Sequence, residues 1–278
     1  MTTDPKDHPT PDLWLRELLG SAAPERVSDR GDAIVVDRLA KRYPNGTEAV
    51  RGISFHVRVG EVFGILGPNG AGKSTTMGML GTLVRPTGGN ATVAGFDIAD
   101  HPHEVRRRIG FAMQEVGVDD LATGRELLVL HARLHGLSRR EATRRAGMLL
   151  DLVGLAETAD RRMAEYSGGM QRRADLASAL IHLPPVLFLD EPTEGLDPHG
   201  RSAIWSTLER LNGALGMTVV LTTHYMEEAD RLCDRIAIVD HGRIVVEGTP
   251  AALKRAAGSL TLEEAYLNST RRTLGAAA

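Results

Sequence analysis

A glycine-rich stretch at residues 67–75 has the residue types of a loop that binds phosphate. It matches the pattern GxxxxGKS/T, in which backbone N–H groups surround phosphate oxygens and a lysine reaches the outer phosphates. A predicted strand at residues 62–66 precedes it and a predicted helix at residues 74–84 follows, which disfavours a chance glycine-rich turn. We therefore expect Lys73 to bridge the β- and γ-phosphates of a nucleotide and Ser74 to bind Mg²⁺. The predicted phosphate-site residues are Gly67, Pro68, Asn69, Gly70, Ala71, Gly72, Lys73, Ser74 and Thr75.

Two adjacent carboxylates, Asp190 and Glu191, end an apolar run at residues 186–189. Such a run is typical of a central parallel strand buried on both faces, and ligands bind outside the carboxyl ends of these strands. We expect Asp190 to hold Mg²⁺, directly or through water, and Glu191 to activate the attacking water as a general base. An isolated Asp-Glu pair would more often be a helix cap or a solvated turn. Its place downstream of the phosphate loop favours the catalytic interpretation.

A third segment, Ser167-Gly168-Gly169, lies between the phosphate loop and the paired carboxylates. It precedes a helix predicted over residues 170–182. Backbone N–H groups at a helix start, a serine hydroxyl and two residues without side chains form a second place where a phosphate can bind. Judged from these residues alone, a serine that caps a helix after a flexible turn is the better explanation.

Together, the phosphate loop, the Ser-Gly-Gly segment and the paired carboxylates resemble the motifs of ATP-binding-cassette (ABC) ATPases over about residues 33–250. Members of that superfamily close two copies head to tail over ATP. The resemblance implies that Ser167, Gly168 and Gly169 contact the γ-phosphate bound by a second copy of the chain. Tyr166 and Met170 depart from the commonest form of the motif, which has leucine and glutamine there.

The same resemblance assigns roles to four further residues. Tyr43 matches the aromatic residue that stacks on adenine, although an edge-strand tyrosine is its simpler explanation. Gln114 matches the glutamine that reaches Mg²⁺ and the attacking water. Asp197 matches the aspartate that couples the two nucleotide sites, and with the proline after it also reads as an ordinary helix start. His224 matches the histidine that contacts the γ-phosphate and holds the attacking water and Glu191 in place.

Composition narrows the setting of this chemistry. The chain has 278 residues, a net charge of −3 and one cysteine, Cys233, so it contains no disulfide framework and suits a reducing cytosol. The near-neutral charge argues against a nucleic-acid partner held mainly by electrostatics. No apolar run approaches the roughly 18 residues of a membrane span, and the N-terminus has no signal-peptide pattern. We expect a peripheral protein on the cytoplasmic side of the cell membrane.

Other residues that could bind a metal or a lipid have simpler explanations. His131 and His135 are spaced like metal ligands on a helix, but their surroundings supply no third ligand, so Mg²⁺ is the only metal expected. Arginine clusters, such as residues 106–108, are expected on solvated helix faces, with contact to anionic lipid headgroups as the alternative.

The elements that position these residues follow from the sequence pattern. Residues 53–59 alternate apolar and polar as in a half-buried antiparallel strand, and Asn45-Gly46 before them indicates a hairpin turn. Thr123-Gly124-Arg125-Glu126 is a capping box that opens a helical region. Residues 240–243 join two apolar runs as a hairpin.

We therefore predict an α/β fold: a P-loop NTPase (RecA-like) core with an antiparallel β-subdomain and an α-helical subdomain. The expected divisions are a partly disordered N-terminal extension at 1–32, a nucleotide-binding domain at 33–250 with its helical subdomain at about 115–165, and a C-terminal appendage at 251–278.

The resemblance predicts an ATP hydrolase, with ATP and Mg²⁺ as cofactors, that works as a homodimer with a separate transmembrane permease. Residues 166–170 and 262–267 resemble the daunorubicin-resistance-type branch, whose members export drugs, lipids or polysaccharides. An importer, a lipoprotein-release ATPase, a soluble ABC protein and a small-molecule kinase remain alternatives. Permease docking is expected around residues 114–120, with apolar contacts from Phe111, Met113, Val116 and Val118.

Overall fold

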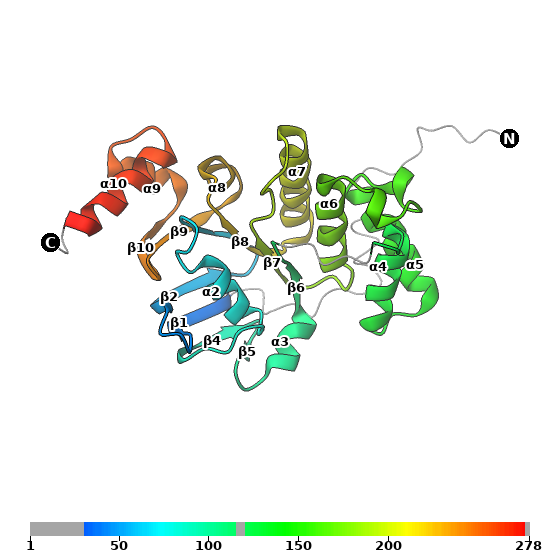
Figure 1. Cartoon of the computed structure of the whole chain (residues 1–278), viewed down its shortest axis with the longest axis horizontal. Coiled ribbons are helices and arrows are strands. Elements are labelled where there is room, and N and C mark those ends of the chain that lie inside the picture. Colours follow the sequence, from blue (N-terminus) through cyan, green and yellow to red (C-terminus); the bar gives the residue numbers. More distant parts are fainter. Residues whose placement is uncertain (1–30, 115–119, 276–278) are drawn as a thin grey trace.

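The computed structural model describes residues 31–114 and 120–275 (Figure 1). Residues 1–30, most of the predicted N-terminal extension, lie outside the described residues. So do Val116 and Val118, two of the four residues expected to dock the permease. None of the helices within the described ranges is both long enough and apolar enough to cross a membrane.

The first sheet is antiparallel and forms the predicted β-subdomain. Its strands have the order β2-β1-β4-β5. Along β2, Ile53, Phe55 and Val57 are buried while Ser54 and Arg58 are exposed, as the alternation predicted. The strands are β1 (Asp32–Arg42), β2 (Glu48–Arg58), β4 (Gly88–Val93) and β5 (Phe96–Asp97).

The second sheet forms the core and is mainly parallel. Its strands have the order β10-β9-β3-β8-β7-β6, and only β10 runs antiparallel to its neighbour. Because the other five are parallel, their carboxyl ends meet at one edge, where ligands bind in open α/β sheets. The strands are β3 (Val62–Leu66), β6 (Ile109–Ala112), β7 (Val186–Asp190), β8 (Thr218–Thr223), β9 (Arg235–Asp240) and β10 (Arg243–Gly248).

Alternate residues of the core strands face opposite layers, because successive side chains of a strand point to opposite sides. Phe188 packs with the β-subdomain and with α2 (Lys73–Leu80), whereas Leu187 and Leu189 pack with the helices of the other face. Those helices are α6 (Gly168–Ala179), α7 (Pro198–Leu215) and α8 (Met226–Leu232) (Figure 1). The core sheet is therefore covered on both faces, which explains why every residue of β3 and β7 is buried.

The helical subdomain lies to one side of the core (Figure 1). It contains α4 (Gly124–Leu134), which begins with the predicted capping box of Thr123 and Glu126, and α5 (Arg139–Leu152). Tyr166 is buried there and donates a hydrogen bond to the carbonyl of Thr158 at 2.7 Å. The tyrosine that departs from the commonest motif therefore stabilises the segment leading into α6. The short helix α3 (Pro102–Arg108) connects β5 to β6.

Two of the predicted helices have different bounds in the structure. The helix after the phosphate loop ends at Leu80 rather than residue 84, because Thr82 has a positive φ of 61° and the chain turns back. The next turn is closed by the N–H groups of Leu83 and Val84, which both donate to the Gly78 carbonyl. At the other site, α6 begins at Gly168 instead of residue 170, because Ser167 itself is the N-cap.

The C-terminal segment packs onto the core. It forms α9 (Pro250–Ala257) and α10 (Leu262–Gly275). Leu253, Leu262 and Ala265 are buried in the same apolar cluster as α6, α7 and α8. Lys254 also forms an ion pair with Asp230 of α8 at 2.7 Å. The predicted division after residue 250 falls at the first residue of α9.

Candidate active site

The phosphate loop joins β3 to α2 in a conformation that requires glycine. A Cβ atom on Gly67 would lie 2.2 Å from the carbonyl oxygen of Val239, and one on Gly72 would lie 2.3 Å from that of Ala49. Gly72 also has a φ of 103°, which L side chains rarely adopt. The loop is thus pressed between β2 and the β9–β10 turn, and its backbone curves ahead of the α2 N-terminus as an anion site needs.

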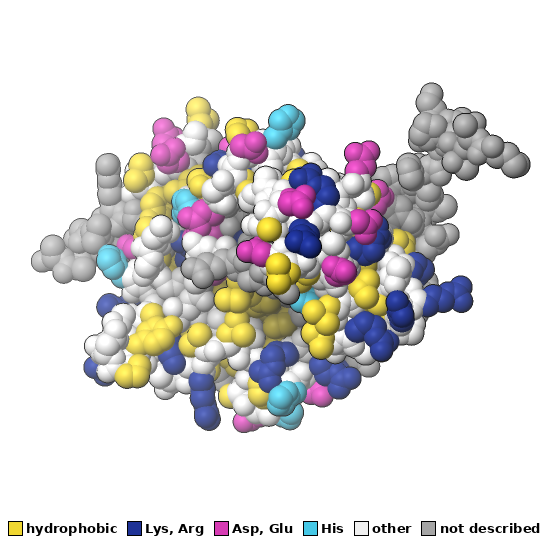
Figure 2. Space-filling view, turned by 45° about the vertical axis from the view of Figure 1, so that its right-hand side comes forward, with side chains coloured by type: hydrophobic (Ala, Val, Ile, Leu, Met, Phe, Trp, Pro, Cys, Tyr) yellow, Lys and Arg dark blue, Asp and Glu magenta, His cyan; other side chains and the backbone are white. Residues whose placement is uncertain are grey.

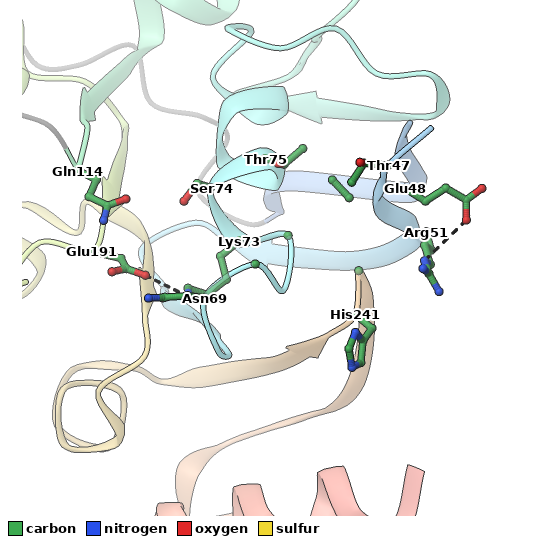
Figure 3. A pocket seen from close by; sticks show the side chains of 14 residues that line it. Thr47, Glu48, Arg51, Asn69, Lys73, Ser74, Thr75, Gln114, Glu191 and His241 are labelled. Atoms are coloured by element: carbon green, nitrogen blue, oxygen red, sulfur yellow. Dashed lines mark ion pairs between the residues drawn. The ribbon is translucent and has the colours of Figure 1, made fainter. Parts of the chain in front are cut away.

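A pocket of about 430 Å³ opens at this loop (Figure 3). Its size is within the range of small-molecule sites. Its lining comes from the phosphate loop and start of α2, the start of β2, the β9–β10 turn, and the two residues Gln114 and Glu191. Tyr43, the predicted adenine contact, does not line the pocket itself but lies nearby, with its hydroxyl 3.4 Å from Thr75 Oγ1.

Lys73 and Glu191 form an ion pair at the floor of the pocket. Lys73 Nζ lies 3.0 Å from Glu191 Oε1 and also donates to the carbonyls of Gly67 and Pro68 at 2.9 and 3.2 Å. Glu191 has a positive φ of 48°, an uncommon conformation for a residue with a side chain. It is held by a hydrogen bond from its N–H to Thr222 Oγ1 at 3.0 Å. Backbone strain of this kind is concentrated at functional sites.

Oxygen ligands converge beside this pair in a way that fits Mg²⁺. Ser74 Oγ donates to Asp190 Oδ1 at 3.2 Å, and the Thr222 hydroxyl donates to the same carboxylate oxygen. Gln114 presents its amide oxygen on the side of Ser74 (Figure 3). Hydroxyl, carboxylate and amide oxygens are hard ligands of the kind that Mg²⁺ prefers. The donor set therefore fits the ion that the sequence predicts there.

His224 and Glu194 complete the surroundings of Glu191. His224 Nδ1 lies 3.1 Å from Glu191 Oε2, and Gln114 Nε2 donates to Glu194 Oε2 at 2.6 Å. Burial opposes ionisation of Glu191, but hydrogen bonds from Glu194 and Lys73 outweigh it and lower the pKa of Glu191. The hydrogen bond with Glu191 raises the pKa of Glu194, as does burial. Glu191 is therefore held ionised, as a general base must be.

Sequence reasoning missed Glu194 and Arg172. Glu194 is three residues after Glu191, and its N–H donates to the Glu191 carbonyl at 3.2 Å, so a tight turn brings the two carboxyls together. The buried Arg172 of α6 donates to the backbone carbonyls of Pro192 at 3.0 Å and Asp190 at 2.6 Å, and also to that of Met113. The spacing of two acids in a Pro-containing turn could have indicated the first contact; an arginine inside a basic run gave no signal for the second.

The Ser-Gly-Gly segment lies apart from the pocket of its own chain. Ser167 and Gly168 are exposed, and the Ser167 hydroxyl accepts the N–H of Met170 at 3.3 Å as the N-cap of α6. A Cβ atom on Gly168 would meet nothing within 4 Å. Packing within the chain thus does not explain this glycine, whereas an approaching ligand would. Asp197 is exposed and caps α7 by accepting the N–H of Gly200 at 2.7 Å.

The two histidines spaced like metal ligands have other contacts. His131 Nδ1 pairs with the Ser178 hydroxyl, and the ring of His135 stacks on that of His182 at a centroid distance of 3.9 Å. Within residues 31–114 and 120–275, the only group of three or more His, Cys, Asp or Glu side chains with metal-ligand spacing is Glu191, Glu194 and His224.

These histidines line a second cavity, of about 270 Å³, between α4, α6 and β6. Burial lowers the pKa of His182 to about 4 and raises that of Asp175, which also lines the cavity, to about 6. His182 Nε2 bonds to the carbonyl of Ile109 at 3.0 Å. Among the described residues, its Nδ1 and Asp175 Oδ2 are buried without a hydrogen-bond partner, and Asp175 Oδ2 lies 3.7 Å from the Arg172 guanidinium as an ion pair.

Comparisons with known proteins place the chain among relatives that bind ATP. Residues 50–194 match the family described as ABC transporter. The chain is 51% identical to the daunorubicin/doxorubicin resistance ATP-binding protein DrrA of Streptomyces peucetius, over 83% of this chain and 69% of the relative. It is 48% identical to the Nod factor export ATP-binding protein I of Sinorhizobium fredii, over 80% of this chain and 61% of the relative. A solved dimeric ATP-binding cassette, in a post-hydrolysis state bound to ADP and Pi, superposes with a TM-score of 0.72 at 29% identity, covering 78% of this chain and 98% of that one.

Proposed function

The chain belongs to the ABC transporter family and is an ATP-binding, ATP-hydrolysing subunit of such a transporter. We propose that it energises export through a separate membrane permease. The single observation that carries the catalytic part is the convergence of Lys73, Ser74 and Glu191 on one pocket, with Asp190 hydrogen-bonded to Ser74 behind them. Their strand ends and loops lie far apart in the sequence but meet at one edge of the core sheet.

Each residue of the site has a role that its geometry supports. Lys73 would leave Glu191 to bind the β- and γ-phosphates, and Ser74, Asp190 and Gln114 would hold Mg²⁺. The ion would supply positive charge beside the phosphate oxygens. Glu191 accepts the proton of the attacking water, and its depressed pKa keeps it ionised for that task. His224, 3.1 Å from Glu191, holds the carboxylate toward the γ-phosphate.

A second copy of the chain completes the site in this proposal. Ser167 is exposed, caps α6 and lies outside the pocket of its own phosphate loop, so its hydroxyl and the α6 N-terminus are available to a phosphate on another chain. A related cassette is dimeric when bound to ADP and Pi, which supports the pairing of two copies. Asp197 of the α7 N-terminus then lies on the face between the two copies.

The proposed permease contact is the surface beside the second cavity. Leu83, Met113, Leu130 and Leu134 are all large apolar residues left exposed at the ends of α2 and β6 and along α4. Hydrophobic side chains also gather around a hollow on the face shown in Figure 2. Exposed apolar patches of this kind mark interaction sites. A permease bound here would hold the subunit at the cytoplasmic side of the membrane.

The proposed cargo is an amphipathic compound of the drug, lipid or polysaccharide class. The names of the relatives support this, since one confers resistance to daunorubicin and doxorubicin and the other serves Nod factor export. The test uses inside-out vesicles that contain a candidate permease together with this subunit. ATP should drive doxorubicin accumulation with the wild-type subunit but not with Glu191→Gln. Equal accumulation with both subunits, or ATP-driven loss of drug from the vesicles, would contradict the proposal.

A further inference from the structure

The side chain of Gln114 makes a polar contact with Glu194. Gln114 Nε2 donates to Glu194 Oε2 at 2.6 Å, a short distance for an N–H···O hydrogen bond. Glu194 comes from the turn that follows β7, whereas Gln114 follows β6, so the contact joins two loops that are 80 residues apart in the sequence.

This contact decides which way the amide of Gln114 points. The amide has one acceptor atom and one donor group at equivalent positions, and either could face the pocket. In this contact Glu194 Oε2 is the acceptor, so the amide turns its nitrogen to Glu194. The oxygen is then directed to the opposite side, toward the Ser74 hydroxyl (Figure 3). That is the orientation in which Gln114 offers an oxygen to a cation held by Ser74 and Asp190.

We propose that Glu194 is a positioning residue that selects the Mg²⁺-binding orientation of the Gln114 amide. The inference rests on the proposed role of Gln114 as a Mg²⁺ ligand. Glu194 adds to that role a fixed rotamer, because a glutamine without this partner is free to rotate and to turn its NH₂ group toward the cation.

The backbones that carry the two residues are themselves held together. Arg172 donates to the carbonyl of Met113, the residue before Gln114. It also donates to the carbonyl of Pro192, two residues before Glu194. Within the second loop, Thr193 is fully buried and its hydroxyl donates to Glu228 Oε1 at 2.8 Å. Glu194 is therefore presented from a rigid turn, which is the requirement for orienting another side chain.

The test measures cation binding without turnover. The full-length chain is saturated with a non-hydrolysable ATP analogue, and Mn²⁺, a spectroscopic substitute for Mg²⁺, is titrated by electron paramagnetic resonance. Glu194→Ala removes the acceptor and is expected to weaken Mn²⁺ binding about two- to tenfold, the range for loss of one hydrogen bond. Glu194→Gln removes the charge but keeps an acceptor oxygen, and is expected to bind Mn²⁺ nearly as wild type does.

Gln114→Ala separates this inference from the function on which it rests. In the Gln114→Ala background, Glu194→Ala should cause no further loss, because the group that it orients is gone. If Gln114→Ala weakens Mn²⁺ binding but Glu194→Ala does not, the positioning role is wrong and the role of Gln114 stands. If Gln114→Ala has no effect, the role of Gln114 itself is wrong. Equal losses in Glu194→Ala and Glu194→Gln would show a charge effect and would also overturn the positioning role.

Discussion

Lys73 Nζ lies 3.0 Å from Glu191 Oε1, and the two side chains are only 4% and 5% exposed. The lysine that is proposed to bind the γ-phosphate is therefore paired with the proposed general base. An incoming phosphate must compete with Glu191 for Lys73. Once Lys73 binds the phosphate, Glu191 is released and can contact the attacking water. Nucleotide binding and preparation of the base are thus parts of one exchange of partners.

This exchange predicts two effects of Glu191→Gln. The neutral amide keeps the shape of the side chain but pairs weakly with Lys73, so ATP should bind several-fold more tightly. Loss of the base should slow hydrolysis by roughly 10²–10⁴-fold. Phosphate release and nucleotide affinity, measured on the same preparations, check both effects.

The matched control is Glu209→Gln, which changes an exposed carboxyl on α7 that pairs with Arg231 away from the pocket. It should hydrolyse ATP at the wild-type rate. Near-normal turnover by Glu191→Gln would remove Glu191 from the role of base.

A pH effect on stability is expected from the cavity between α4, α6 and β6. Burial raises the pKa of Asp175 to about 6 from 3.8, so its contribution to the free energy of unfolding falls as pH rises from about 4 to 6. Burial lowers the pKa of His182 to about 4 from 6.5, so its contribution falls as pH drops through the same window. Each effect is on the order of 3 kcal/mol, and the two oppose each other.

Variants of the two residues should therefore change the pH dependence of the free energy of unfolding in opposite directions. Between pH 4.5 and 7, Asp175→Asn should make the free energy of unfolding rise more steeply with pH than in the wild type. His182→Gln, whose amide can still donate to the Ile109 carbonyl, should shift that slope in the other direction. Urea unfolding at the two pH values measures both slopes. Parallel curves for all three proteins would mean that neither group changes its pKa on folding.

Permease docking predicts a selective loss of membrane association. Leu134 at the end of α4 is 75% exposed, and Leu134→Asp should leave the chain folded and able to bind ATP while reducing its co-sedimentation with permease-containing vesicles about tenfold or more, the scale of losing one well-buried apolar contact. Leu260→Asp is the control, since Leu260 is 93% exposed between α9 and α10, away from α4. Equal binding of the two variants would move the docking surface elsewhere.

The sequence predicted most of the fold because its motifs stand at the ends of strongly apolar strands. The parallel core, the β-subdomain and the helical subdomain are confirmed, and the loop after β3 and the acids after β7 meet as the strand-end rule requires. The roles of all the site residues, those of Lys73, Ser74, Asp190 and Glu191 included, remain predictions.

The features that could not be predicted from the sequence are contacts between loops, a buried arginine and the end of a helix, all of which depend on the tertiary structure. The contact of Gln114 with Glu194 forms only when both loops are folded, since no repeat or spacing in the sequence relates the two residues. Arg172 is buried by the carbonyls that it binds, and a basic run predicts a solvated face instead. The early end of α2 depends on Thr82, whose positive φ no propensity favours.

The central claim is that one phosphate loop and the Ser-Gly-Gly segment of a second copy form each catalytic site. The most direct measurement mixes two inactive subunits, Lys73→Ala and Ser167→Arg, and follows phosphate release. A heterodimer contains one intact composite site, built from Lys73 of one copy and Ser167 of the other, so activity should return on mixing. If heterodimers form but phosphate release stays at the level of the separate variants, the account of a shared site is contradicted.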